Sequence, residues 1–364
     1  MSAPTDHHKT NAPPSVRLAH AGATKAGFRF PAIKNLLRVA VSVLLLGWIG
    51  WQTDWASVSR AFATLRGEFW LAALGLLLVT QVVGSMRWRL FARSLRFTHS
   101  LPRITSYAFV GNFFNLVLPT SMGGDVIRAF YLDGKSGRKL AAFASVFLDR
   151  LNGLLVLIVM ACMAVLLSPV ALPEWIPLSI GVIAGAGVLG LATLPLAVRS
   201  RRLPAKRARQ LQTMLHLLKE PRTLLAATLL SIFVQLASVV IVWLIGQGLQ
   251  APIPTAYYWI LVPMVSLLTL LPVSINGMGV REGGVVLFLT PLGVEHGMAL
   301  TLAFLWFLVY AAGSLVGGVV YLAGAFPKPE TAAADRTGGE ELTDYGPIPG
   351  DSDQGRAGQY SQAA

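Results

Sequence analysis

Two stretches of sequence that align without a gap decide how this chain folds. Leu118–Arg128 reads LPTSMGGDVIR, and Leu271–Arg281 reads LPVSINGMGVR, 153 residues later. Each stretch interrupts an apolar segment with Pro and Gly and places an arginine just after the interruption. Paired interruptions at corresponding places in two halves of a chain are typical of transporters built from internal repeats. The alternative is a chance likeness between two loops rich in Pro and Gly, and the topology of the chain tests it independently.

The composition is that of a membrane protein. Of the 364 residues, 54% are hydrophobic and 13% are charged, and the mean hydropathy is +0.60. A soluble domain carries about a quarter charged residues. The formal net charge of +13 would suggest nucleic acid as the partner of a soluble chain. Here the basic residues lie in short loops between apolar segments, so we expect no nucleic-acid partner and anionic lipids at the cytoplasmic loops.

The apolar segments predict an all-α polytopic fold. Six of them are long enough to cross a bilayer, namely 36–53, 69–86, 141–167, 176–198, 223–245 and 298–323. The segments 104–118 and 257–271 have only 15 residues each, below the ~20 that a crossing helix needs. Each is followed by a Pro-Gly break and a short apolar return, which predicts two re-entrant broken hairpins. The alternative is that these arms cross fully, which would give eight or more spans.

The distribution of Lys and Arg orients these segments. Residues 1–38, 87–103, 135–139 and 199–222 contain 22 Lys and Arg, whereas 53–68, 168–175, 246–256 and 293–297 contain 2. The positive-inside rule places the first set in the cytoplasm. The first hairpin then enters from the cytoplasm and the second from outside. The second half of the chain is therefore expected to be inverted relative to the first.

The chain divides into one membrane domain and two polar tails. The membrane domain covers residues 35–324, with repeat 1 at about 35–168 and repeat 2 at about 176–324. Residues 1–34 are polar and basic, and residues 325–364 are acidic and rich in Gly, Ala and Pro. Such segments cannot bury enough apolar surface to fold, so we expect two disordered cytoplasmic tails.

Charged residues inside the apolar region mark the candidate site, because a charge at the centre of a membrane helix costs at least ~2.5–3.5 kcal/mol. These residues are Asp125 and Arg128 after the first break, Arg281 and Glu282 after the second, and Asp149 and Arg150 on one long helix. Adjacent residues on a helix do not face each other. We therefore expect Asp149 and Arg150 each to pair with another element, most obviously with the hairpin charges.

Two interpretations of these charges are open. In the first, they line a polar cavity near the midplane, where Arg128 and Arg281 bind the phosphate or carboxylate of a head group. In the second, pairs such as Asp149–Arg128 or Glu282–Arg150 only hold the bundle together, since buried ion pairs are often structural.

Small and polar residues near the two breaks complete the predicted substrate-binding set. The glycines that would let backbone amides approach the anion are Gly123, Gly124, Gly277, Gly279, Gly283 and Gly284. Asn112 and Asn115 either hydrogen-bond in the cavity or cap the broken helix. Ser121 and Ser274 belong to the same set, and Pro119 and Pro272 are the predicted hinges. On the last span, Gly313, Gly317 and Gly318 indicate close helix packing.

The sequence lacks the motifs of several enzyme classes. It has no Walker loop, no His, Cys and carboxylate set with metal spacing, and no membrane Ser with a His partner. We therefore expect no metal, no cofactor and no enzymatic activity. One alternative is a glycosyl- or phosphotransferase that acts on a lipid carrier, with Asp125, Asp149 or Glu282 as base or metal ligand. The other is a scaffold for lipid-biosynthesis enzymes that uses the basic loop 199–222.

Three motifs together carry a resemblance to a known family. PTSMGGDVIR at 119–128, SVFLDRLNGL at 145–154 and PVSINGMGVREGG at 272–284 resemble the transmembrane flippase-like family, which includes the membrane region of bacterial lysylphosphatidylglycerol synthases. The likeness covers about residues 36–324. The positions that match the family pattern are Pro119, Gly123, Gly124, Arg128, Asp149, Arg150, Pro272, Gly277, Gly279, Arg281 and Glu282.

The resemblance implies a lipid flippase or scramblase of the bacterial inner membrane, with a polar-headed, phosphate-bearing lipid as its substrate. Fused members of the family carry a soluble aminoacyl-transfer domain after the membrane region, whereas this sequence ends in about 40 polar residues. We therefore expect that it does not make aminoacylated lipid by that route. Lipid-biosynthesis enzymes and a second copy of the chain are the candidate protein partners.

Overall fold

The computed structural model describes most of the predicted membrane domain. It describes residues 55–63, 65–118, 123–134, 136–168, 173–199, 220–270 and 277–324, and the single positions Leu44, Gly47, Trp48, Trp51 and Ser274. The predicted tails, most of the predicted first span and the basic residues 200–219 lie outside the described residues. So do Pro119, Ser121 and Pro272.

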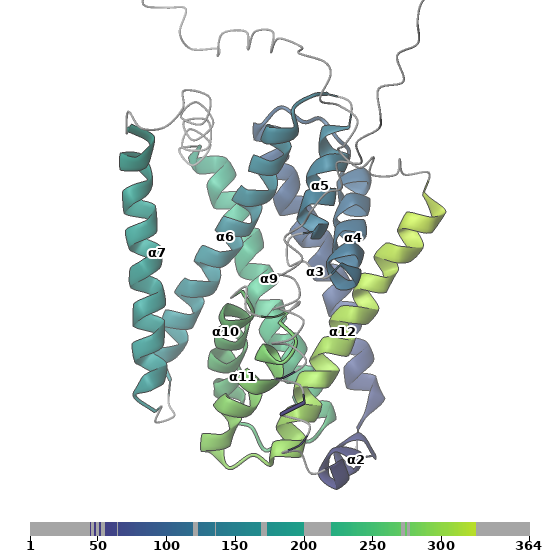
Figure 1. Cartoon of the computed structure of the whole chain (residues 1–364), viewed down its shortest axis with the longest axis vertical. Coiled ribbons are helices and arrows are strands. Elements are labelled where there is room, and N and C mark those ends of the chain that lie inside the picture. The colour runs from purple at the N-terminus through teal and green to yellow at the C-terminus, as the bar shows by residue number, and fades with distance from the viewer. Residues whose placement is uncertain are drawn as a thin grey trace, which may run out of the picture. The chain divides into compact units, whose positions relative to one another are not determined.

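Every regular element in these ranges is a helix, which confirms the all-α class (Figure 1). The elements are α2 (Trp55–Ala63), α3 (Gly67–Ser94), α4 (Leu101–Val117), α5 (Gly123–Asp133), α6 (Lys139–Leu166), α7 (Trp175–Arg199), α9 (Pro221–Gly248), η1 (Thr255–Tyr257), α10 (Tyr258–Thr269), α11 (Val280–Leu289), η2 (Thr290–Leu292) and α12 (His296–Ala323).

Four of the helices are long and apolar enough to cross a membrane. They are α3, α6, α9 and α12, with 28 residues each and a mean hydropathy of 1.8 to 2.4 over their most apolar windows. A bilayer core about 30 Å thick needs about 20 helical residues at 1.5 Å per residue, so each has residues to spare. Helix α7 has 25 residues. These helices make the chain a multi-pass membrane protein.

Both predicted hairpins form, and their arms are short. Helices α4 and α5 have 17 and 11 residues, and α10 and α11 have 12 and 10. Each pair turns back on itself. The Tyr107 and Tyr131 rings stack at 5.5 Å where α4 begins and α5 ends, and the Tyr257 hydroxyl donates to the Phe288 carbonyl where α11 ends and α10 begins.

The two hairpins start at opposite ends of the bundle, as the charge distribution predicts. The end of α3 and the start of α9 meet through Ser94 and Glu220 (Oγ–Oε2 distance 3.4 Å), and the first hairpin lies at that end. The start of α3 and the end of α9 meet through a 2.9 Å bond from the Arg66 amide to the Gly248 carbonyl. The second hairpin follows from there, and Figure 1 shows both pairs reaching inward from opposite ends.

The described helices therefore repeat with inverted direction. Helices α3 to α6 form a long helix, a broken pair and a long helix, and α9 to α12 form the same series running the opposite way (Figure 1). The corresponding helices α3 and α9 begin 154 residues apart, and α6 and α12 begin 157 residues apart. This agreement in length and order supports a real repeat over a chance likeness of two loops.

Glycines let the first hairpin pack closely against its neighbours. A Cβ on Gly124 of α5 would overlap the Gly111 carbonyl oxygen of α4, and a Cβ on Gly317 of α12 would overlap the Phe109 carbonyl oxygen. A Cβ on Gly313 of α12 would lie 2.7 Å from Leu77 Cδ2 of α3, which is also too close. The predicted role of the α12 glycines in close packing is confirmed.

One boundary of the prediction is wrong, and the difference matters for the site. The second span was expected to end at Met86, with Arg87, Arg89 and Arg93 in a loop, but α3 continues to Ser94. Arg87 is therefore on a helix and is only 9% exposed.

Candidate functional site

The first hairpin carries two of the predicted charges on one face of α5. Asp125 lies in the first turn of the helix, and Arg128 follows one turn later, with Arg128 Nη1 3.6 Å from Asp125 Oδ1. An acid in the first turn of a helix also meets the positive end of the helix dipole. Arg128 is 6% exposed, so its guanidinium is held inside the bundle.

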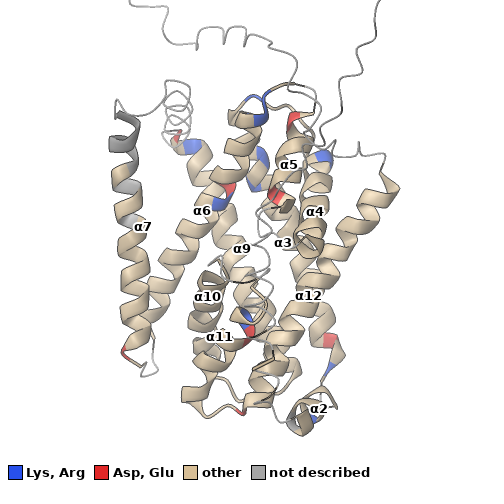
Figure 2. Cartoon of the chain, in the orientation of Figure 1, with Lys and Arg blue, Asp and Glu red and all other residues tan. Residues whose placement is uncertain are grey.

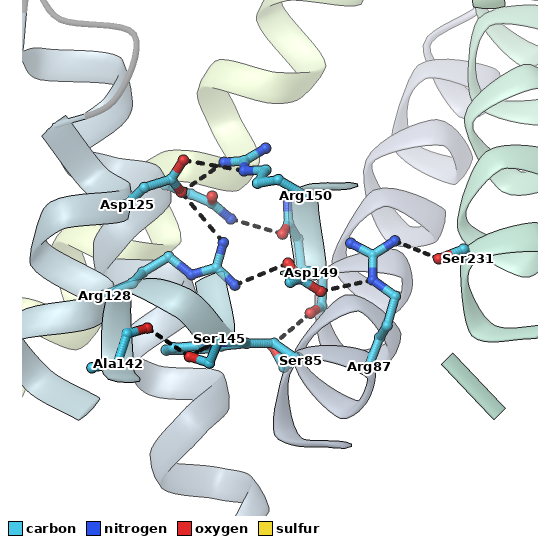
Figure 3. Close-up of polar contacts among 12 residues, drawn as sticks. Ser85, Arg87, Asp125, Arg128, Ala142, Ser145, Asp149, Arg150 and Ser231 are labelled. Atoms are coloured by element: carbon cyan, nitrogen blue, oxygen red, sulfur yellow. Dashed lines mark hydrogen bonds and ion pairs between the residues drawn. The ribbon is translucent and has the colours of Figure 1, made fainter. Parts of the chain in front are cut away.

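Asp149 of α6 lies between two arginines from different helices. Its Oδ1 accepts a 2.7 Å hydrogen bond from Arg87 Nε of α3, and its Oδ2 lies 3.6 Å from Arg128 Nη2 of α5 (Figure 3). Asp149 is 3% exposed. One carboxylate therefore ties the first hairpin to two long helices, and removing it would take the counter-ion from buried Arg87 and leave buried Arg128 with Asp125 alone.

Arg150, the next residue on α6, pairs with Asp125 of α5. Its Nη2 and Nε donate to the two Asp125 oxygens at 2.9 and 3.2 Å, which is the bidentate geometry that favours strong Arg–carboxylate pairs. About half of the Arg150 side chain is exposed. The prediction that Asp149 and Arg150 pair with other elements is confirmed. The predicted Glu282–Arg150 pair is wrong, because Arg150 forms its ion pair with Asp125.

The polar network continues through Arg87 to α9. Arg87 Nη1 donates to Ser231 Oγ at 2.8 Å, and Ser231 Oγ donates to Asn152 Oδ1 at 2.5 Å. Asn152 in turn donates to Thr228 Oγ1 at 3.1 Å. The network thus joins α3, α5, α6 and α9 by hydrogen bonds and ion pairs. We call Arg87, Asp125, Arg128, Asp149 and Arg150 the first cluster.

The first cluster has an excess of positive charge. Three arginines face two aspartates, which leaves one net positive charge. The Arg128 guanidinium also lies 4.3 Å from the centre of the Trp88 ring, and its Nε has no hydrogen-bond partner among the described residues. A net cation with an unpaired donor in a buried site can attract an anion.

Sequence reasoning missed Arg87, although the sequence contains a signal for it. Ala73, Leu77, Thr80 and Phe91 are buried on α3, and Arg87 falls on the same stripe at helical spacing. We assigned Arg87 to a loop together with Arg89 and Arg93, because a run of arginines after an apolar segment normally marks a membrane interface.

The second hairpin has a different arrangement. Helix α11 begins after Gly279, whose φ of 82° is a conformation that glycine adopts easily. Glu282 Oε2 accepts a 2.6 Å hydrogen bond from the Gly279 amide, and Glu282 Oε1 lies 3.3 Å from Arg281 Nη2. The Arg281 guanidinium also lies 4.9 Å from the centre of the Phe307 ring of α12. Arg281 and Glu282 therefore form a local ion pair at a helix start.

A cavity opens beside Arg281. Its volume is about 190 Å³, and it is lined by Ser266 and Thr269 of α10, Arg281 of α11, and Trp306 and Tyr310 of α12. Ser274, between the arms of the hairpin, is buried, and its hydroxyl has no hydrogen-bond partner among the described residues. The sequence suggested Arg281 and Ser274 but not the α10 and α12 walls, because only the tertiary packing brings these helices together.

The predicted charges therefore gather in two places rather than one. Figure 2 shows charged residues near α5 and α6 and a separate charged pair on α11, nearer the opposite end. The structure brings Asp125, Arg128, Asp149 and Arg150 together, and it keeps Arg281 and Glu282 apart from them. The expectation that Arg128 and Arg281 share one cavity is not met in this conformation.

Several polar groups near the two hairpin breaks already form hydrogen bonds within the chain. Asn115 Oδ1 accepts a 2.8 Å bond from the Gly124 amide, so Asn115 caps the start of α5. Asn112 Nδ2 donates to Gln81 Oε1 of α3 at 2.7 Å. The amides of Gly124 and Gly279 were expected to be open to an anion, and this is wrong because Asn115 and Glu282 accept from them. Gly123 begins α5, and Gly277 adopts a φ of 73° against the Thr269 side chain.

Comparison with known proteins agrees with this architecture. No curated protein matches the chain. The model of one protein family, described as the lysylphosphatidylglycerol synthase TM region, matches residues 35–318, which cover α2 to most of α12 and both clusters of charge. The chain therefore belongs to the family of the lysylphosphatidylglycerol synthase transmembrane region.

Proposed function

We propose that this protein moves a polar-headed, phosphate-bearing lipid between the two leaflets of a membrane, as a flippase or scramblase. One observation carries the proposal. Each of two broken hairpins, entering from opposite ends, holds a buried arginine on the short helix that follows its break, Arg128 in α5 and Arg281 in α11. Family membership supports a role connected with membrane lipids.

The physical argument concerns the head group. A lipid crosses a bilayer slowly because its charged head group must leave water for hydrocarbon. Arginine binds phosphate through several donors and keeps its charge in a buried site. A buried arginine on a hairpin from each side would give the head group a partner in either half of the crossing, while the acyl chains stay in lipid.

During transport, Arg128 of the first cluster would exchange its ion-pair partners. Arg128 lies 3.6 Å from Asp125 and 3.6 Å from Asp149, which is longer than a tight ion pair. An incoming phosphate would compete with these carboxylates for Arg128, and the net positive charge of the cluster favours it. Inverted halves that rock against each other would open the site to one leaflet and then to the other.

The proposal also covers location, enzymatic activity and partners. We propose a bacterial inner membrane as the location, which is what the family resemblance implies. We propose that both termini are in the cytoplasm, because Lys and Arg concentrate in the loops of one side. We propose no enzymatic activity, since Asp149 and Glu282 are held by arginines and are not free to act as bases. Anionic lipids would bind the basic loops, and lipid-biosynthesis enzymes or a second copy of the chain would be the protein partners.

Reconstitution tests the proposal directly. The purified full chain is placed in liposomes that contain trace amounts of fluorescent lipids with different head groups, and a membrane-impermeant quencher reports how fast each lipid changes leaflet. We expect faster exchange for at least one phosphate-bearing lipid than in protein-free liposomes. Unchanged exchange for every head group in a broad panel would contradict the proposal. Dependence on a divalent metal and a nucleotide-activated donor would instead favour a transferase.

A further inference from the structure

We propose that Arg150 and Asp125 form a hydrated notch in the side of the bundle, through which water and lipid phosphate groups of the cytoplasmic leaflet reach the first cluster. The inference rests on the proposed lipid translocation and adds to it a lateral route into the site. Three observations support it: the exposure of Arg150, its depth along α6 and its unused donors. Hydration of the notch can be measured without any transport, so the two claims can fail separately.

Arg150 is exposed on a helix that is long enough to cross the membrane. Its side chain is 52% exposed, whereas the side chains of Arg87 and Asp149 are 10% and 4% exposed. It lies one turn after Phe147, which is 55% exposed on the same face of α6. An ion pair that only holds helices together needs no such exposure, as Arg87 and Asp149 show. The pair of Arg150 and Asp125 is therefore open to whatever surrounds the bundle.

Arg150 also lies deep along its helix. It is the twelfth residue of α6, which begins at Lys139 and has 28 residues. At 1.5 Å per residue it lies about 17 Å from the start of the helix, and a bilayer core about 30 Å thick covers most of α6. Hydrocarbon cannot solvate a charged side chain, so charges at such depth face protein or water. The exposed part of this guanidinium must therefore meet water or another polar group.

Arg150 keeps donors for such a group. A guanidinium has five N–H groups. Arg150 Nε and Nη2 donate to the two Asp125 oxygens at 3.2 and 2.9 Å, so both contacts use one edge of the guanidinium (Figure 3). Arg150 Nη1 has no acceptor among the described residues. This free edge is suited to the oxygens of water or phosphate, and the excess positive charge of the first cluster favours the anion.

The notch opens toward the end of the bundle at which α6 begins, the cytoplasmic end in the proposed topology. Side chains on a helix point back toward its start, so Arg150 points that way. It also lies nearer that end, at about 17 Å against about 24 Å from the other. Local thinning of the bilayer and entry of water are the usual responses to a charge at this depth. Head groups of the cytoplasmic leaflet would follow the water inward.

The second half of the chain has no charge at the corresponding position. Helices α6 and α12 correspond at a separation of 157 residues, so Phe147 and Arg150 correspond to Phe304 and Phe307. The Phe304 ring contacts the Phe62 ring of α2, with 6.0 Å between the ring centres. The stripe that carries Arg150 in the first half is thus aromatic and partly covered in the second. The notch therefore serves one leaflet.

Two positions of matched depth and exposure test for water. Phe147 of α6 and Leu229 of α9 are each the ninth residue of a 28-residue helix that begins at the same end, and they are 55% and 58% exposed. Phe147 lies one turn from Arg150, whereas the residues one turn from Leu229 are apolar. In the Cys162→Ser background, Phe147→Cys and Leu229→Cys are labelled with a membrane-impermeant maleimide in inside-out vesicles. We expect Phe147→Cys to react about tenfold or more faster, because the thiolate is the reacting form and apolar surroundings suppress it.

Removing the charge locates the cause. Arg150→Leu, added to Phe147→Cys, should slow labelling to the rate of Leu229→Cys, whereas Arg150→Lys should keep it fast. Asp125 retains Arg128 at 3.6 Å in both variants, so no buried acid is left without a cation. Thermal unfolding of each variant separates a change in hydration from a loss of folding.

The phosphate groups are followed with a nitroxide on the same two cysteines. In nanodiscs, a label at Phe147→Cys should broaden the phosphorus NMR signal of the lipid phosphodiesters more than a label at Leu229→Cys, because paramagnetic broadening falls steeply with distance. Inorganic phosphate is added as a competitor, and its separate signal reports a free anion in the notch. Broadening of the inorganic signal without the lipid signal would overturn the assignment to lipid.

The labelling results decide the rest. Equal rates for Phe147→Cys and Leu229→Cys, or fast labelling that persists in folded Arg150→Leu, would overturn the notch. If Phe147→Cys is labelled fast but wild type exchanges no lipid, the notch stands and the transport proposal fails. If wild type exchanges lipid while the two labelling rates are equal, transport stands and the notch is overturned.

Discussion

Arg87 on α3 holds Asp149 on α6 through a 2.7 Å hydrogen bond from Nε to Oδ1, and Asp149 in turn faces Arg128 of the first hairpin. Asp149 lies 3.6 Å from Arg128 of α5, and together with the Trp88 ring of α3 it joins Arg128 to the long helices. Because all three side chains are nearly buried, the position of the hairpin and the balance of charge inside the bundle are set together.

Replacing Asp149 by asparagine should therefore destabilise the protein strongly. The change keeps the shape of the side chain but leaves Arg87 and Arg128 buried without their shared counter-ion, a loss of about 3–5 kcal/mol. Glu295→Gln is the matched control, because the Glu295–Arg60 pair at 3.5 Å is exposed and is worth about 0–1 kcal/mol. Thermal unfolding of both variants in the same detergent measures the difference, and equal midpoints would show that Asp149 is not a structural link.

Gly124→Ala should displace the first hairpin. The added methyl group would overlap the Gly111 carbonyl oxygen and lie 2.6 Å from Asn115 Cγ, so α4 and α5 must move apart. We expect a loss of about 1–3 kcal/mol, the usual cost of overpacking. Gly84→Ala on α3 is the control, since nothing lies within 4 Å of its Cβ and alanine favours a helix. A Gly124→Ala protein as stable as wild type would contradict the close contact of the two arms.

The opposite entry of the hairpins can be tested by labelling. Cys162 is the single cysteine, so Cys162→Ser gives a background for single-cysteine variants. Ser100 precedes α4 and Thr290 follows α11, and both side chains are exposed. A membrane-impermeant maleimide applied outside intact cells should label Thr290→Cys and spare Ser100→Cys. Labelling should reverse in inside-out vesicles, and labelling of both positions from one side would contradict the inverted topology.

Much of the fold could be predicted from local sequence. Pro and Gly within apolar segments mark places where a helix must stop, and Lys and Arg in loops mark one side of a membrane. These local signals predicted the two hairpins and their opposite directions, although they ended α3 eight residues early. A run of arginines normally marks an interface, and only the packed structure shows that Arg87 turns inward to Asp149.

The candidate site was predicted less well, for reasons of tertiary packing. Sequence identified the charged residues, and it indicated that Asp149 and Arg150 find partners on other elements. It did not indicate that Asp125 pairs with Arg150. Nor did it indicate that Asn115 and Glu282 accept hydrogen bonds from the glycine amides at the helix starts. The walls of the Arg281 cavity come from α10 and α12, and no local pattern marks Thr269, Trp306 or Tyr310 as neighbours of Arg281.

The central claim is that the two hairpin arginines carry lipid, and one measurement tests it most directly. Wild type, Arg128→Gln, Arg281→Gln and the exposed control Arg60→Gln are reconstituted at equal density, and the leaflet exchange of a phosphate-bearing lipid is followed. We predict that each hairpin variant is slowed about tenfold or more, since each loses a charged hydrogen bond to the head group, while Arg60→Gln matches wild type. Folded hairpin variants that exchange lipid as fast as wild type would contradict the account.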